Sequence, residues 1–203
     1  MQNLNIIPNG LAALDDTYAT IGSPPYIVAE GKLIAYYTAV GSGSGTTYTV
    51  AAASCPVGGP ILDVDSKSVG TYQKNPRNQF QKAGNVIVPS AGIDVGGCYY
   101  PSAVYNAKEK KFMVYYIGEG GGAVLSIAMA IGKDFNSLAK HATAGGATIA
   151  IITPPAGVVI YLLPLQVLFD KEENLYKLYY YGQFFPGPLT RSYLATSKNG
   201  IDF

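Results

Sequence analysis

Short apolar strands separated by polar turns dominate the chain, with little helical periodicity. Three stretches share one plan, in which a proline leads a strand, a polar turn follows, and a second strand ends in two adjacent tyrosines. A proline is tolerated at the first position of a strand because no ladder N–H is needed there. Turns rich in Gly, Asn, Asp or charge separate paired strands, so each stretch predicts a hairpin. The stretches are Pro24–Ala39 ("PPYIVAEGKLIAYYTA"), Tyr100–Gly118 ("YPSAVYNAKEKKFMVYYIG") and Leu163–Gly182 ("LPLQVLFDKEENLYKLYYYG").

Two further elements recur in the same order. A third strand alternates apolar and small polar residues and is followed by a tight turn. A short apolar strand stopped by proline forms the fourth element. The third strands lie in Tyr48–Gly59 ("YTVAAASCPVGG"), Ser126–Phe135 ("SIAMAIGKDF") and Ser192–Phe203 ("SYLATSKNGIDF"), and the fourth in Leu4–Pro8, Asn85–Pro89 and Ile149–Pro154.

Four antiparallel strands that recur along a chain are typical of β-propeller blades. The pattern predicts an all-β fold: one propeller-like domain over residues 1–203, built from three four-stranded blades. The units are roughly residues 9–89, residues 90–154, and residues 155–203 together with 1–8. The N-terminal strand Leu4–Pro8 would then complete the last blade, in its own chain or in a neighbour. A β-sandwich is the alternative.

Composition narrows the classes of partner. Charged residues make up 13% of the 203 residues, against about 25% in typical globular domains. The net charge is +1, and no basic block extends beyond Lys108–Lys111, which argues against nucleic acid. Seventeen tyrosines, 24 glycines and no tryptophan favour strands and tight turns. The first residues carry no visible signal peptide. The uncharged stretch Ala142–Phe169 contains three prolines, so it predicts buried strands and not a membrane span.

The residues that commonly carry redox or metal chemistry are few. Cys55 and Cys98 could form one bridge, but two small buried side chains are the preferred interpretation. His141 is the only histidine, and no metal-ligand spacing surrounds it. The glycine-rich stretches Gly41–Gly45 and Gly118–Ala123 connect strands, whereas a phosphate cradle requires a following helix. We therefore expect neither a metal nor a cofactor.

The second unit, "NVIVPSAGIDVGGCYYPSAVYNAKEKKFMVYYIGEGGGAVLSIAMAIGKDF" (Asn85–Phe135), resembles a known blade sequence. It is similar to blades of the five-bladed β-propeller glycoside hydrolase superfamily, which includes families 43, 62, 32, 68, 117 and 130. There a Tyr-rich strand precedes a closing phrase with which "YLATSKNGIDF" (Tyr193–Phe203) compares closely. The resemblance touches all three units and concerns the repeat, so it supports the fold more than an activity.

The resemblance implies two carboxylates facing each other across a sugar, at or just before the Pro-led strands. At the corresponding positions this chain has Ser102 after Pro101, Leu162-Leu163 before Pro164, and Pro24-Pro25, so the expected acids are missing.

Two aspartates in the loops before Pro-led strands match the family's acids more loosely. Asp16 and Asp94 lie there, and both could reach the pore mouth as a catalytic pair. The competing interpretation is that an aspartate in a Gly-rich loop caps its own turn.

Aromatic rings stack on sugar faces, and neutral polar loops hydrogen-bond to hydroxyls. Tyr18, Tyr99, Tyr100 and Tyr161 flank the Pro-led strands and are the candidate ligand-binding residues, although most tyrosines of such a fold pack between blades.

The sequence thus favours a non-catalytic, glycan-recognising or structural propeller module on a cell-surface or virion assembly, with carbohydrate and self-association as partners. An active glycoside hydrolase or phosphorylase using Asp16 and Asp94 is the alternative. An extracellular or virion-surface location is expected.

Overall fold

The structure is a computed structural model that describes residues 18–19, 26–40, 47–57, 81–121, 125–152, 163–183 and 190–203. Every regular element in these ranges is a strand, which confirms the all-β prediction. No helix able to cross a membrane is found among the described residues. The strands are β1 (Tyr18–Ala19), β2 (Tyr26–Ala29), β3 (Lys32–Val40), β4 (Tyr48–Pro56), β5 (Gln81–Ile87), β6 (Gly97–Asn106), β7 (Lys111–Glu119), β8 (Leu125–Asp134), β9 (Ser137–Lys140), β10 (Leu163–Asp170), β11 (Leu175–Gln183) and β12 (Thr190–Ser197).

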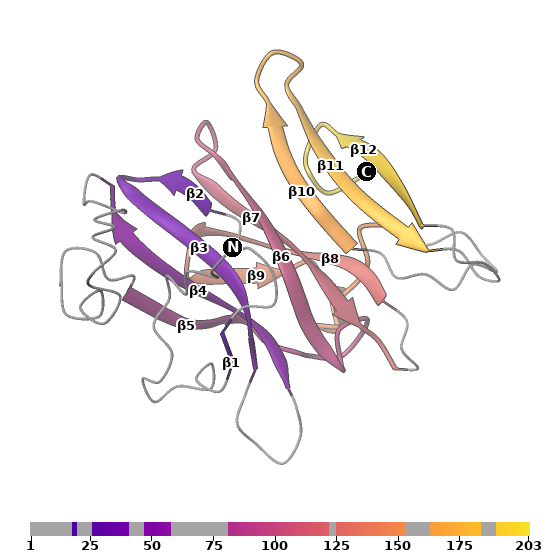
Figure 1. The fold of residues 1–203 in the computed structure, drawn as a ribbon. Coiled ribbons are helices and arrows are strands. Elements are labelled where there is room, and N and C mark those ends of the chain that lie inside the picture. The colour runs from indigo at the N-terminus through magenta and orange to yellow at the C-terminus, as the bar shows by residue number, and fades with distance from the viewer. Residues whose placement is uncertain are drawn as a thin grey trace.

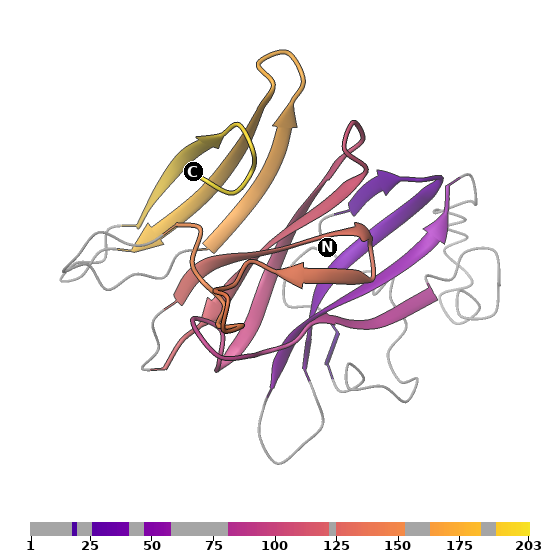
Figure 2. The same cartoon turned by 180° about the vertical axis from the view of Figure 1, so that it is seen from behind.

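The strands form three consecutive antiparallel units, each made from neighbours in the sequence. The first unit contains β2 to β5, the second β6 to β9, and the third β10 to β12. One parallel pair, Tyr48 with Gly97, joins the first two units into a nine-stranded sheet that also includes β1. The third unit is a separate three-stranded sheet, and neither sheet closes on itself. The second unit lies between the other two (Figures 1 and 2).

Local sequence explains the hairpin turns. Glu30 and Gly31 link β2 to β3 with φ angles of 52° and 72°, which is the tight turn that suits the twist of two strands. The turns after β6 and β10 are longer and match each other. Asn106 and Asp170 open them, and the Oδ1 of each accepts backbone N–H groups two and three residues later, at 3.0 and 3.1 Å in both turns. The second and third units therefore share one turn structure, which the first unit does not have.

Both Pro-led strands of the second and third units carry a bulge beside their proline. In β6 the register shifts between Tyr99 and Ser102, and in β10 it shifts between Pro164 and Gln166. A bulge bends its strand and re-aims the side chains next to it. Proline at this point lacks the N–H that a regular ladder would need, so the sequence and the irregularity agree.

The units pack face to face through the paired tyrosines. Tyr36 of the first unit donates its hydroxyl to the carbonyl of Phe135, in the turn after β8, at 2.8 Å. Tyr115 of the second unit donates in the same way to Gly200, in the turn after β12, at 2.8 Å. Both tyrosines have no exposed surface. Gly200 has a φ of 73°, and a Cβ there would lie 2.5 Å from the Cε of Met113, so this close approach requires glycine.

The fourth strands agree with the prediction only in the first unit. The strand expected at Asn85–Pro89 is present as β5, which starts earlier and pairs with β4. The prediction of a strand at Ile149–Pro154 is wrong for the described residues 149–152. They form no regular strand, and Ile152 makes an isolated bridge to Ile127. The unforeseen β9 takes the edge of β8 because a two-residue hairpin returns the chain onto it at once. Leu4–Pro8 lies outside the described residues.

Candidate functional site

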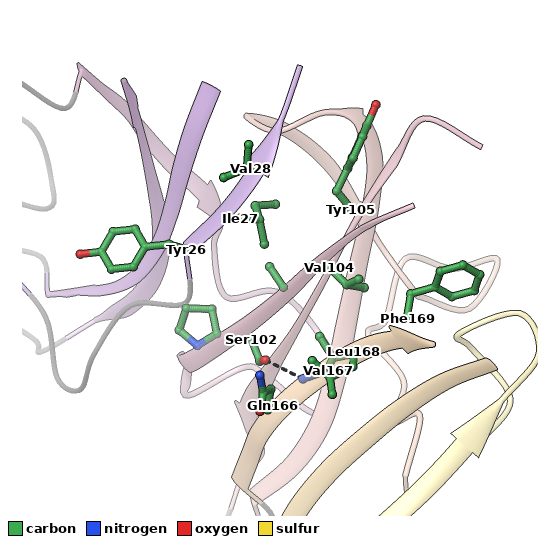
Figure 3. A pocket seen from close by; sticks show the side chains of 12 residues that line it. Tyr26, Ile27, Val28, Ser102, Val104, Tyr105, Gln166, Val167, Leu168 and Phe169 are labelled. Carbon is green, nitrogen blue, oxygen red and sulfur yellow. Dashed lines mark hydrogen bonds between the residues drawn. The ribbon is translucent and has the colours of Figure 1, made fainter. Parts of the chain in front are cut away.

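The first strands of the three units, β2, β6 and β10, come together around one cleft. Residues 26–28, 101–105 and 166–169 line this cleft, which has a volume of about 530 Å³ (Figure 3). Each of the three segments begins at, or within two residues after, the proline of its Pro-led strand. The repeat therefore places equivalent strands of successive units side by side along one cavity.

A direct hydrogen bond holds two of the cleft walls together. The Oγ of Ser102 accepts the backbone N–H of Val167 at 3.0 Å, and this contact between β6 and β10 is drawn dashed in Figure 3. Ser102 is only 3% exposed and Val167 is also buried. Ser102, which occupies a position where the resemblance implies an acid, therefore stabilises the contact between β6 and β10.

Aromatic, aliphatic and neutral polar groups make up the lining. The exposed Gln166 lies beside Ser102 in Figure 3, whereas the ring of Tyr26, which is 40% exposed, points away from the cleft. None of the described lining residues is charged. At the cleft edge, the hydroxyl of Tyr105 donates to the Glu30 carboxylate at 3.2 Å. Apolar walls with a few amide, hydroxyl and backbone groups suit a neutral, hydroxyl-rich ligand, whereas two-carboxylate hydrolysis has no acid pair in this lining.

Two of the tyrosines predicted to bind a ligand lie at the start of β6. Tyr99 packs against Tyr48 with ring centroids 4.4 Å apart, and against Tyr100 at 6.4 Å. The hydroxyl of Tyr99 donates to the Glu119 carboxylate. Burial, and then this hydrogen bond to Glu119, raise the pKa of Tyr99 well above its usual value. Tyr99 therefore stays protonated, and able to donate this bond, to a higher pH than a free tyrosine.

Tyr100 is the strained member of this group. It has a φ of 44°, which is unusual for a bulky residue and for a residue before proline, and it is 38% exposed. Its backbone N–H donates to the Thr38 Oγ1 at 2.9 Å, a bond that holds the bulge against β3. Pro101, which follows it, lines the cleft. Strain of this kind concentrates at functional sites.

Asp94 is held inside the protein by five hydrogen bonds. Its Oδ2 accepts from the Lys140 Nζ at 2.6 Å, the Tyr116 hydroxyl at 2.9 Å and the Cys98 thiol at 3.6 Å. Its Oδ1 accepts from the backbone N–H and the hydroxyl of Ser90, at 3.2 and 3.3 Å. The residue is 0% exposed, and it does not line the cleft. A paired, fully bonded carboxylate of this kind anchors its loop.

The other predicted site residues are described only in part. Asp16 and Tyr161 lie outside the described residues, and of Tyr18 only the backbone is described, as part of β1. The structure therefore does not place Asp16 beside Asp94, and the catalytic pair stays a prediction. Cys55 and Cys98 are buried and unbridged, as the preferred interpretation held. No cluster able to bind a metal occurs among the residues that the structure describes.

Sequence reasoning missed Lys140, Glu119 and Gln166. Lys140 lies on β9, a strand that the pattern did not predict. Glu119 ends β7 opposite Gly97, within the glycine-rich stretch Gly118–Ala123 that the sequence predicts as a connection between strands. The signal that could have found Glu119 is its place at the end of a Tyr-rich strand, across from the start of a Pro-led strand.

The comparisons with known proteins support the fold. No protein-family model matches the chain, and no curated protein matches it. An α-L-arabinofuranosidase from Lactobacillus brevis superimposes with a TM-score of 0.59 at 11% identity, over 94% of this chain and 54% of that one. An endo-1,4-β-xylanase from Bacteroides thetaiotaomicron superimposes with a TM-score of 0.57 at 15% identity, over 91% and 50%. The chain thus has a glycosidase-like fold and spans about half the length of these structures.

Proposed function

We propose that this chain is a carbohydrate-recognising module of the β-propeller type that binds its ligand without cleaving it. The units act as successive blades, with β2, β6 and β10 as the innermost strands around the cleft. The observation that carries this proposal is the cleft lining, which combines apolar side chains, one amide and backbone groups and contains no charged residue among those described. Sugar recognition requires such groups, and hydrolysis requires acids in addition.

The repeated packing between units supports the blade assignment. Tyr36 and Tyr115 occupy equivalent positions and make the same contact to the closing turn of the following unit. The fold likeness to an arabinofuranosidase and a xylanase supports a pentose-containing glycan as the first ligand class to test.

Titration calorimetry with β-1,4-linked xylo-oligosaccharides and arabinofuranosyl-substituted oligosaccharides tests the proposal. We expect binding, and we expect Gln166→Ala, which removes the exposed amide of the lining, to weaken it about tenfold, a loss of roughly 1.4 kcal/mol. Thr196→Ala is the control, because it removes an exposed polar group of the same sheet that does not line the cleft. Equal losses in both variants, or no binding at all, would contradict cleft recognition.

Incubation with 4-nitrophenyl α-L-arabinofuranoside and β-xyloside separates binding from hydrolysis. We expect no turnover. Turnover that Asp94→Asn abolishes in a protein of unchanged stability would establish the glycosidase alternative instead. Absence of both binding and turnover would favour a purely structural module, for which a cell-surface or virion location remains the prediction.

A further inference from the structure

Glu119 is a half-buried carboxylate that has no basic partner in the described part of the chain. Three of the described acidic residues are not exposed, namely Asp94, Glu119 and Asp170. Asp94 forms a salt bridge with Lys140 at 2.6 Å, and Asp170 forms one with Lys177 at 2.8 Å. Among the described residues Glu119 forms none. Moving a carboxylate out of water is unfavourable unless a cation or hydrogen-bond donors compensate, so Glu119 has capacity for a cation from outside.

The side-chain bond between Tyr99 and Glu119 orients this carboxylate. It is not needed to pair their strands, because Gly97 and Glu119 are already partners in the ladder of β6 and β7, and the Gly96 N–H donates to the Glu119 carbonyl at 2.7 Å. The Tyr99 hydroxyl donates to the Oε2 of Glu119, while its Oε1 has no hydrogen-bond donor among the described residues. One carboxylate oxygen is thus held in place and the other is available to a ligand.

Two successive glycines leave room for this pair. A Cβ at Gly97 would lie 2.8 Å from the Tyr99 hydroxyl oxygen, and a Cβ at Gly96 would lie 3.1 Å from the Glu119 Cγ. Both distances are shorter than the optimal separation of non-bonded carbon atoms, about 3.5–4.0 Å. The sequence before β6 is therefore fitted to the Tyr99–Glu119 pair.

The bulge in β6 gathers tyrosine rings beside the same carboxylate. Successive residues of a regular strand point to opposite faces, but the rings of Tyr99 and Tyr100 are stacked, with centroids 6.4 Å apart and an interplanar angle of 29°. The φ of 44° at Tyr100 departs from regular strand geometry at a cost in backbone strain. Tyr48 adds a third ring, 4.4 Å from that of Tyr99. We call Tyr48, Tyr99, Tyr100 and Glu119 the tyrosine–glutamate site.

We propose that the tyrosine–glutamate site binds the ammonium group of an amino sugar. A carboxylate accepts charge-assisted hydrogen bonds from an ammonium group, and the electron-rich faces of tyrosine rings attract the same charge. The sugar class rests on the proposed function. Pro101 follows Tyr100 directly and lines the cleft, so a glycan in the cleft can place one of its units at this site. The two sites together favour a β-1,4-linked glucosamine oligomer over its N-acetylated form.

Titration calorimetry with the glucosamine tetramer and its N-acetylated counterpart, at a pH below the pKa of the amines, tests the proposal. We expect the amino form to bind at least roughly tenfold more tightly, the effect of one hydrogen bond to a charged group. Glu119→Gln keeps an acceptor for the Tyr99 hydroxyl but removes the charge, so it should abolish this preference. Glu172→Gln makes the same change in charge at an exposed residue in the turn after β10, and should retain the preference. A wild-type protein without the preference, or a preference that survives Glu119→Gln, would overturn the proposal.

Tyr100→Gly separates contact with the ligand from a structural role. Glycine adopts the φ of 44° without strain, so the melting temperature should not fall. Loss of the ring should weaken binding of the glucosamine tetramer roughly two- to fivefold, the effect of one exposed cation–π contact. A lower melting temperature with unchanged affinity would show that the ring only packs against Tyr99, and would refute its place in the site.

Xylo-oligosaccharide binding by the same variants distinguishes this inference from the proposed function. Neutral ligands should bind Glu119→Gln as tightly as the wild type, because Glu119 does not line the cleft. Binding of neutral oligosaccharides without any preference for the glucosamine tetramer would overturn the amino-sugar site alone. Binding of the glucosamine tetramer alone, dependent on Glu119, would support the site and contradict recognition of neutral glycans by the cleft. Methylammonium that binds as tightly as the tetramer would overturn the assignment to a sugar.

Discussion

Removing the Asp94 carboxylate should destabilise the fold, because this group holds the loop before β6 in place. Asp94→Ala leaves the Lys140 ammonium, whose side chain is 15% exposed, without its partner at 2.6 Å. It also leaves the Tyr116 hydroxyl and the Ser90 N–H without their acceptor. Breaking one partner out of a buried ion pair costs about 3–5 kcal/mol. For a chain of this size that corresponds to a melting temperature lower by roughly 6–20 °C.

A double-mutant cycle separates the ion pair from the rest of the site. Lys140→Met alone leaves the Asp94 charge buried, so it should be nearly as costly as Asp94→Asn. The double variant Asp94→Asn, Lys140→Met removes both charges and should recover part of the loss, with a coupling energy of about 0.5–3 kcal/mol. Urea unfolding followed by tyrosine fluorescence measures all four proteins. Additive losses, within about 0.3–0.5 kcal/mol, would refute the assigned pairing.

The same variants distinguish anchoring from catalysis. If Asp94 is an anchor, its substitution lowers stability, and glycan binding changes only as far as the loop moves. If Asp94→Asn leaves the urea midpoint unchanged and removes a measurable glycosidase turnover, the carboxylate acts on substrate and the anchoring argument is wrong.

Three further outcomes follow from buried groups. Tyr115→Phe deprives the Gly200 carbonyl of its donor and should lower the free energy of unfolding, measured in urea, by about 1–3 kcal/mol. An unchanged free energy of unfolding would contradict the role of Tyr115 between the units. Burial raises the pKa of Tyr115 and of Tyr116, so the contribution of each to stability should be constant up to about pH 10. Above that pH it should fall by roughly 1.4 kcal/mol per pH unit for each, because only the unfolded state ionises. Equal slopes from about pH 10 to 12 for the wild type and Tyr115→Phe would refute this. Burial also raises the pKa of the Cys55 and Cys98 thiols, so Ellman's reagent should react with both only after denaturation. Fast reaction of either thiol in the native protein would contradict their burial.

The candidate site could be predicted from the sequence only where one strand and its turn suffice. The Pro-led strands were predicted from local pattern, and they line the cleft. Lys140 could not have been found, since it contacts Asp94 from 46 positions along the chain and lies on an unpredicted strand. Glu119 was missed because only the pairing of β6 with β7 brings it to Tyr99.

By itself the sequence determined the all-β class, the hairpins and their turns, because these depend on contacts between residues close in the chain. Asn106 and Asp170 cap their turns through backbone groups two and three residues away, so the pattern contains the whole interaction. Tertiary structure alone decided which side chains are covered. Tyr36, Tyr115 and Tyr179 occupy the same place in the repeat, but burial depends on whether another unit packs against them. That is a long-range property, and it separates an interior tyrosine from a surface one.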